Sequence, residues 1–161
     1  MRAVVVSLCL ALTLSFGLAA IAGEQRATGL NEVQSTYLQY CGGCHGIQGI
    51  SAPHEVPNLR GQVRSFLCTP AGRAYLVRLP NVALAPISDA LLAEVMNFVV
   101  FDLDGSSSTV PDTTSYTAAE VARLRQRPLT DTGLADYRER IVTELIDRCG
   151  APASLRAYSV R

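Results

Sequence analysis

The sequence contains no lysine, and only two histidines and two methionines occur among its 161 residues. Its 14 basic side chains, all of them arginine, balance 14 acidic ones, so the formal net charge is zero. A neutral chain lacks the positive field with which proteins bind nucleic acid or an anionic membrane surface, and we expect neither as a partner. Any basic patch must consist of guanidinium groups, which suit planar, bidentate contacts.

The N-terminal residues have the pattern of an export signal. Arg2 begins a short positive region, residues 3–21 are almost wholly apolar, and Ala20 and Ala22 are small residues at a cleavage position. Cleavage after Ala22 leaves 139 residues, enough for one compact domain with its own core. Left uncleaved, the apolar run approaches the roughly 20 residues that span a bilayer and would contact a membrane. We predict a signal peptide over 1–22 and a periplasmic or otherwise exported protein.

Cys41-Gly42-Gly43-Cys44-His45 is the most specific motif of the chain. Two cysteines three positions apart, followed directly by a histidine, are the attachment pattern of a c-type haem, in which both thiols form thioethers and the histidine is an axial ligand of the iron. A structural zinc site needs two further ligands at matching spacing, and no second Cys-x-x-Cys or His-x3-His occurs. A thioredoxin-like dithiol would lie in a βαβ unit, which is absent here. We predict one covalently bound haem c.

Hydrophobic residues recur at helical spacing along most of the chain, which predicts an all-α fold. A polar or hydroxyl side chain precedes most of these helices as a cap, namely Thr28 or Asn31, Ser88, and Thr117 with Glu120 as a capping box. We expect helices from about Leu30 into the cysteine motif, over 62–68, from Ala90 to about Leu103, after Thr117, and from about Thr132 to Cys149. Residues 46–61 and 79–86 are expected as loops and 69–72 as a break, whereas 73–79 fit a helix or an extended segment equally well.

From about Leu30 to Leu103 the chain resembles the class I cytochromes c. The resemblance rests on the cysteine motif at the end of an N-terminal helix, on Val56-Pro57-Asn58-Leu59-Arg60-Gly61 after it, and on Pro86-Ile87-Ser88-Asp89, which opens a helix with aromatic Phe98. It implies a cytochrome c-like haem domain over 23–104. The residues beyond the resemblance, 105–161, are interpreted as a linker and a C-terminal helical extension that either packs on this domain or forms part of a partner interface. The resemblance also implies that the Pro57 carbonyl accepts a hydrogen bond from Nδ1 of His45, which fixes the tautomer and ring angle of an axial ligand.

The second axial ligand of the iron is left open by the sequence. Electron carriers of this family usually place a methionine in the loop before the last haem-domain helix, and residues 79–86 contain none. Met96 is the only methionine after signal removal, and it is either an iron ligand or one more residue of an apolar helix face. His54 precedes Pro57 by three residues, so we expect it on the side of His45 or at the surface. We predict a five-coordinate or weakly ligated iron.

Two functions follow from this pattern. The first is an exported monohaem electron carrier, a monomer that passes electrons between redox partner proteins such as a dehydrogenase, an oxidase or another cytochrome. The alternative is a haem enzyme or small-ligand-binding haem protein, which needs an open distal site. No distal acid or base for peroxidase chemistry stands out in the sequence. We therefore favour a carrier over an enzyme.

The remaining cysteines and arginines have structural interpretations. Cys9 leaves with the signal segment, and Cys68 and Cys149 form either a disulfide, which an exported protein favours, or two separate buried thiols. Arg73 and Arg78 either pair with the haem propionates or lie in solvent. The charged face of the last helix, expected in solvent with i,i+4 pairs, consists of Arg138, Glu139, Arg140, Glu144 and Arg148.

Overall fold

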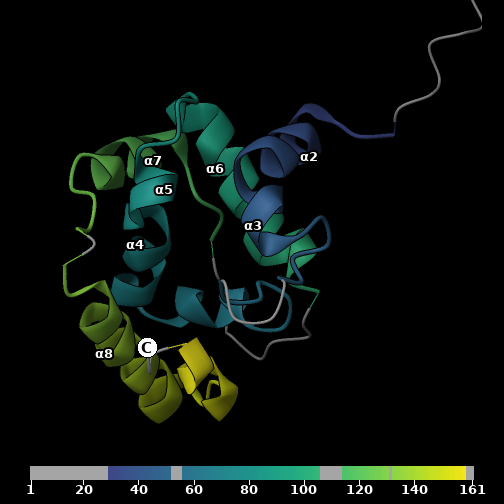
Figure 1. Ribbon diagram of the computed structural model, residues 1–161. Coiled ribbons are helices and arrows are strands. Elements are labelled where there is room, and N and C mark those ends of the chain that lie inside the picture. The colour runs from purple at the N-terminus through teal and green to yellow at the C-terminus, as the bar shows by residue number, and fades with distance from the viewer. Residues whose placement is uncertain (1–28, 52–55, 106–113, 131, 159–161) are drawn as a thin grey trace, which may run out of the picture. The chain divides into compact units, whose positions relative to one another are not determined.

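Figure 1 shows the computed structural model, which describes residues 29–51, 56–105, 114–130 and 132–158. The chain divides into two units, Met1–Leu30 and Asn31–Arg161. Of the first unit only Gly29 and Leu30 are described, so the predicted signal segment, Cys9 and Thr28 lie outside the described residues, as does His54. The described part of the second unit consists of helices without any strand, which confirms the all-α prediction. No helix within the described ranges is long and apolar enough to cross a membrane.

The first helical segment begins at Asn31 and runs into the cysteine motif. Asn31 Oδ1 accepts a hydrogen bond from the Gln34 amide at 2.9 Å, and the Gln34 side chain accepts one from the Asn31 amide at 3.1 Å. The segment consists of three successive parts, α2 (Glu32–Tyr37), the π-helical η1 (Leu38–Gly42) and α3 (Gly43–His45). It ends at Gly46, whose φ is 75° and where a Cβ would lie 2.2 Å from the Ile50 carbonyl oxygen. Only glycine fits this turn, which stops the helix directly after His45.

Three short helices follow in the middle of the chain: η2 (Val63–Cys68, a 3-10 helix), α4 (Pro70–Arg78) and α5 (Pro80–Ala83). The break predicted after Cys68 is present, since η2 ends there and Thr69 has an extended backbone. Thr69 also caps the next helix, α4, by accepting a hydrogen bond from the Gly72 amide at 3.1 Å, so residues 70–72 are already helical. Pro70 takes the first helical position, where it has no amide left to satisfy. Residues 73–78, left open by the sequence, are therefore helical, and part of the loop expected at 79–86 is the single turn α5.

The helix predicted from Ala90 to about Leu103 is present as α6 (Asp89–Asn97) and the π-helical η3 (Phe98–Leu103). Ser88 Oγ accepts a hydrogen bond from the Leu91 amide at 3.1 Å and caps its start. Phe98 meets Tyr37 of α2 edge to face, with ring centroids 5.6 Å apart. This helical pair contributes a large share of the core, in which the buried side chains from the second helix are Leu92, Ala93, Val95, Met96, Val99 and Val100.

Residues beyond 113 form three helices, α7 (Ala118–Arg125), α8 (Leu134–Cys149) and η4 (Ala153–Tyr158). Helix α7 packs on α6 and α4 (Figure 1). Helix α8 packs on α4 and η2, and η4 packs on α8. A disulfide joins Cys68 of η2 to Cys149 at the end of α8, which confirms the pairing that the sequence favoured. The C-terminal extension is thus attached to the preceding residues at both of its long helices.

A cluster around Arg73 holds α7 in place. The Arg73 guanidinium donates to both Glu120 carboxylate oxygens, at 2.7 and 2.8 Å, and to the Thr114 carbonyl at 2.7 Å. Its Cζ lies 4.0 Å from the centroid of the Tyr116 ring, and the Tyr116 hydroxyl donates to the Arg73 carbonyl at 2.9 Å. The bond from Arg73 lowers the pKa of the Glu120 carboxyl, and burial raises the pKa of Tyr116. Glu120 therefore stays ionised at neutral pH and completes a charge-assisted, bidentate pair.

Several polar side chains are engaged differently from the sequence expectation. Arg73 binds Glu120, and Arg78 Nε donates to the Arg127 carbonyl at 2.6 Å, so both arginines contact the extension. Arg138 is only 7% exposed and donates to the Leu155 carbonyl at 2.9 Å, where a solvated residue was expected. Asp104, expected in a linker, is buried and accepts hydrogen bonds from the Gln62 and Arg64 amides at 3.0 and 3.2 Å.

Candidate functional site

The structure brings Cys41, Cys44 and His45 together in the last turns of the first helical segment. Cys41 is half-buried and Cys44 is exposed, and both are free thiols, whereas Cys68 and Cys149 are bonded to each other. Burial raises the pKa of the Cys41 thiol, and the neighbouring Cys44 adds to this shift. The Cys41 thiol is therefore protonated at neutral pH, and both motif cysteines are available for covalent attachment of a group.

The two glycines between these thiols leave the motif uncovered. A Cβ on Gly43 would meet no other atom within 4 Å, whereas a Cβ on Gly42 would lie 3.2 Å from Cδ2 of Leu38. Gly43 itself is exposed. The surface between the cysteines is thus free of side chains, as the close approach of a flat group requires.

His45 is oriented by the backbone of Pro57. Its Nδ1 lies 3.0 Å from the Pro57 carbonyl oxygen, which is the contact that the family resemblance implies. Because a carbonyl only accepts hydrogen bonds, Nδ1 carries the proton and Nε2 has a free lone pair. Partial burial lowers the pKa of His45, and the contact with Pro57 opposes this shift. The imidazole is therefore neutral at neutral pH and fixed in the tautomer that binds a metal through Nε2.

Short hydrogen bonds hold the segment around Pro57 against the loop that follows α3. Asn58 Oδ1 accepts from the amide and the hydroxyl of Ser51, each at 2.8 Å. The Leu59 amide donates to the Gly49 carbonyl at 2.9 Å. These bonds fix the position of the Pro57 carbonyl, and the Pro57 ring makes none of them. The loop predicted at 46–61 therefore orients His45 through this carbonyl.

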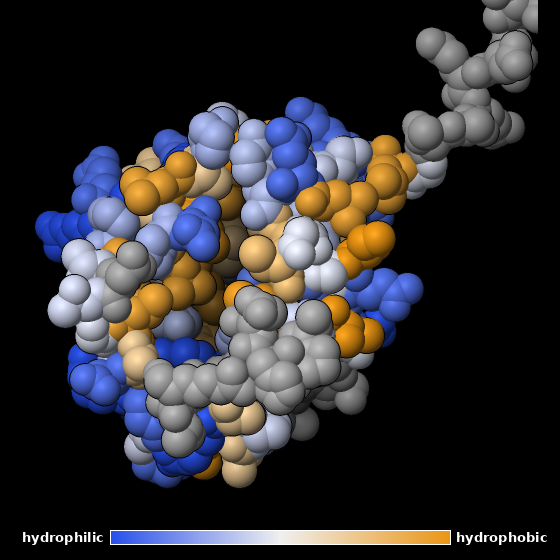
Figure 2. Space-filling model, viewed as in Figure 1, coloured by the Kyte–Doolittle hydropathy of each residue, from blue (hydrophilic) through white to orange (hydrophobic). Residues whose placement is uncertain are grey.

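Figure 2 shows a hollow in this face of the molecule, with hydrophobic side chains along its walls. Comparison with Figure 1 places α3 on one side of the hollow and α4 and α5 on the other. Large exposed hydrophobic residues occur in the segments on both sides, namely Tyr40, Ile47, Ile50 and Leu84. An apolar space thus opens beside the cysteine motif. A second pocket, of about 290 Å³ at the start of α8, contains none of the predicted site residues.

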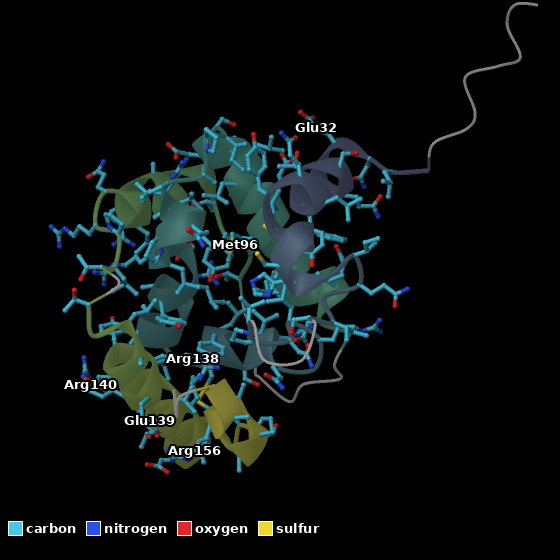
Figure 3. All side chains as sticks on the ribbon, viewed as in Figure 1. Glu32, Met96, Arg138, Glu139, Arg140 and Arg156 are labelled. Atoms are coloured by element: carbon cyan, nitrogen blue, oxygen red, sulfur yellow. A yellow bond between two sulfur atoms is a disulfide. The ribbon has the colours of Figure 1, made fainter. Side chains whose placement is uncertain are left out.

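Met96 belongs to the hydrophobic core. It is 6% exposed and lies on α6, near the middle of the view in Figure 3, between α3 and α4. This position agrees with the prediction that Met96 is one more residue of an apolar helix face. Its other predicted role, as an iron ligand, stays a prediction. His54, the other candidate, lies outside the described residues.

The donor set fits a haem better than a bare metal ion. Within the described ranges, no three or more His, Cys, Asp and Glu side chains are grouped to hold an ion. Two thiols and one oriented imidazole are the groups that hold a c-type haem. Two buried polar atoms, Arg64 Nε and Gln62 Oε1, have no hydrogen-bond partner in the described part of the chain. A buried, unpaired guanidinium nitrogen fits a carboxylate, a group that haem carries on its propionates.

Sequence reasoning missed two residues that shape this region. Arg125, the last residue of α7, donates hydrogen bonds to the connection between α5 and α6. Asp104 holds the start of η2, where Gln62 and Arg64 lie. The side-chain contacts named here all join residues more than thirty positions apart, so no local pattern signals these roles.

No protein-family model, curated protein or solved structure matches this chain. The functional assignment therefore rests on the residues of the site.

Proposed function

We propose that this protein is an exported monohaem c-type cytochrome with a cytochrome c-like haem domain, and that it carries electrons between redox proteins. The observation that carries the proposal is the geometry at the end of α3: two unpaired thiols precede a histidine whose Nδ1 is 3.0 Å from a backbone carbonyl. Disulfide formation between Cys68 and Cys149 leaves only these two cysteines free among the described residues.

Each residue of the site would hold a different part of the haem. Cys41 and Cys44 would form the thioethers, and His45 would bind the iron through Nε2. Pro57 keeps the imidazole in one orientation, and Arg64 is available for a propionate carboxylate. Bound haem supplies a one-electron couple between ferric and ferrous iron. The apolar walls of the hollow in Figure 2 exclude water from that couple.

Transfer of single electrons to another protein needs a surface for brief contact. Tyr40, Ile47 and Ile50 flank the motif and are 40%, 74% and 54% exposed. Exposed apolar residues at one place favour association, and the lack of a net charge leaves this contact independent of a strong overall field. These features support a carrier that docks on a partner close to the haem.

The alternative, a haem enzyme or a binder of small ligands, is favoured by one observation. Residues 79–86 lack methionine and histidine, and Met96 is in the core, so no ligand for the second axial position is evident on the wall opposite α3. An open position would admit carbon monoxide, cyanide or peroxide. Turnover of peroxide, measured against electron exchange with other cytochromes, separates the two functions. We expect exchange without turnover.

Covalent attachment is the direct test of the proposal. The full-length protein, expressed in a periplasm that contains haem-attachment machinery, should give a haem stain that survives denaturing electrophoresis. C41A/C44A should lose the stain. C68A/C149A is the matched control, since it removes two other cysteines and should keep the stain. A C41A/C44A protein that still stains, or a folded wild type without covalent haem, contradicts the proposal.

A further inference from the structure

Arg125 joins the C-terminal extension to the connection between α5 and α6. Its side chain is 17% exposed, and its guanidinium uses four of its five N–H groups in contacts with this connection. Nε donates to the Ala83 carbonyl at 2.8 Å, Nη2 to the Ala85 carbonyl, and Nη1 to the Ile87 carbonyl at 2.9 Å and to Asp89 Oδ1 at 2.8 Å. One side chain from α7 thus binds the carbonyls of every second residue from Ala83 to Ile87, together with the first residue of α6.

The connection has few hydrogen bonds of its own. Between the end of α5 and Ser88, the Leu84 amide donates to the Pro80 carbonyl at 3.0 Å and the Ala85 amide to the Val82 carbonyl at 3.2 Å. The Ile87 amide donates to the Ala85 carbonyl at 2.8 Å. Ala83 and Ala85 are buried, so their carbonyls have little access to water. Without Arg125 the Ala83 carbonyl would lose the donor Nε and bear the full cost of desolvation, whereas the Ala85 carbonyl would keep the Ile87 amide. The shape of this connection therefore depends on Arg125.

The connection follows directly on α5, which with α4 lies on the side of the hollow opposite α3. In the view of Figures 1 and 2, α4 and α5 form one side of the hollow, and α3, which ends at His45, forms the other. Nε2 of His45 is the nitrogen left free by Pro57. A haem held by His45 in the hollow would present its second axial side to the α4–α5 wall.

We propose that Arg125 is a positioning residue, through which the extension keeps this wall rigid and limits the access of small ligands to the second axial side of the haem. The inference rests on the proposed function for its haem. The dependence of the connection on Arg125 holds whether or not haem is bound. The extension then has a task beyond covering the core, because it determines how fast a diatomic molecule reaches the iron.

Arg125→Gln tests the inference, with Arg123→Gln as the matched control. Arg123 is an exposed residue of the same helix, so its substitution removes the same charge without touching the connection. The first readout is hydrogen exchange of peptides spanning 79–89 in the full-length protein. We expect amides there to exchange about tenfold faster in R125Q, the factor that one lost charge-assisted hydrogen bond gives, and unchanged in R123Q. The second readout is the association rate of carbon monoxide with the ferrous haem protein, which should rise in R125Q only.

The outcomes distinguish the inference from the function on which it rests. Unchanged exchange in R125Q overturns the role of Arg125, whether or not haem is attached. Faster hydrogen exchange in R125Q with an unchanged association rate of carbon monoxide overturns the proposal that Arg125 limits ligand access to the iron. Failure of haem attachment in the wild type refutes the proposed function, while the exchange result still decides the role of Arg125. If R125Q does not fold, R125K replaces it; a lysine ammonium cannot span four acceptors, so the same changes are expected in smaller measure.

Discussion

Removal of the Cys68–Cys149 disulfide should lower the free energy of unfolding by about 4.5 kcal/mol. The bond joins residues 81 positions apart. The chain-entropy relation for a loop of that length gives about 4.5 kcal/mol at room temperature, because the cross-link restricts mainly the unfolded chain. Another native contact also joins these helices, since Tyr75 of α4 and Tyr137 of α8 stack with ring centroids 6.0 Å apart.

The measurement is urea unfolding of the full-length protein and of C68A/C149A, followed by far-UV circular dichroism. Alanine at both positions avoids new free thiols. The slope of the unfolding free energy with urea should rise in the variant, since an unfolded chain without the cross-link exposes more surface. Wild type unfolded in the presence of a reductant is the control and should match the variant.

A loss below about 1 kcal/mol would refute this reasoning, because it would mean that the unfolded chain gains little freedom from the break. Equal slopes for the two proteins would point to the same conclusion. A loss well above the entropic value, with the reduced wild type unaffected, would instead trace the effect to the alanine substitutions in the native packing.

Two further predictions concern the Arg73–Glu120 pair, which joins α4 to α7, and the core residue Met96. Glu120→Gln should lower stability at neutral pH by roughly 1 to 3 kcal/mol, since it ends a charge-assisted pair with Arg73. Because the folded-state pKa of Glu120 is lowered, the stabilisation is complete above its unfolded pKa and is lost as the pH falls through the folded value, so urea midpoints of the two proteins should converge in acid. Met96→Leu should cost less than about 1.5 kcal/mol and leave the haem spectrum unchanged, as expected for a core residue. Loss of a sulfur-to-iron charge-transfer band in that variant would show that Met96 is the ligand.

The features that the sequence predicted well are those set by neighbours along the chain. Asn31, Ser88 and Thr117 cap their helices by accepting a hydrogen bond from the amide three residues further along the chain. Such caps can be recognised in the sequence from the residue types and their spacing. The cysteine motif and its histidine are equally local. The contact between His45 and Pro57 spans 12 residues and was reached only through the family resemblance.

The features that the sequence did not predict depend on partners far along the chain. Glu120 was expected to bind its own helix start, but its carboxylate binds Arg73, 47 residues away. Arg138 was expected in solvent, but η4 folds back to offer it the Leu155 carbonyl. Pro70 lies in the predicted break after η2, but the sequence did not show that it also begins α4, where a proline at the first helical position leaves no amide unsatisfied.

The disulfide also closes residues 68–149 into a covalent ring. Any single cut of the backbone within that ring, for instance after Arg127 between α7 and α8, leaves both pieces joined through the two sulfur atoms. A nicked molecule would therefore migrate as one species until it is reduced. The residues beyond the ring, once bonded, cannot be separated from those before it by one protease cut inside the ring.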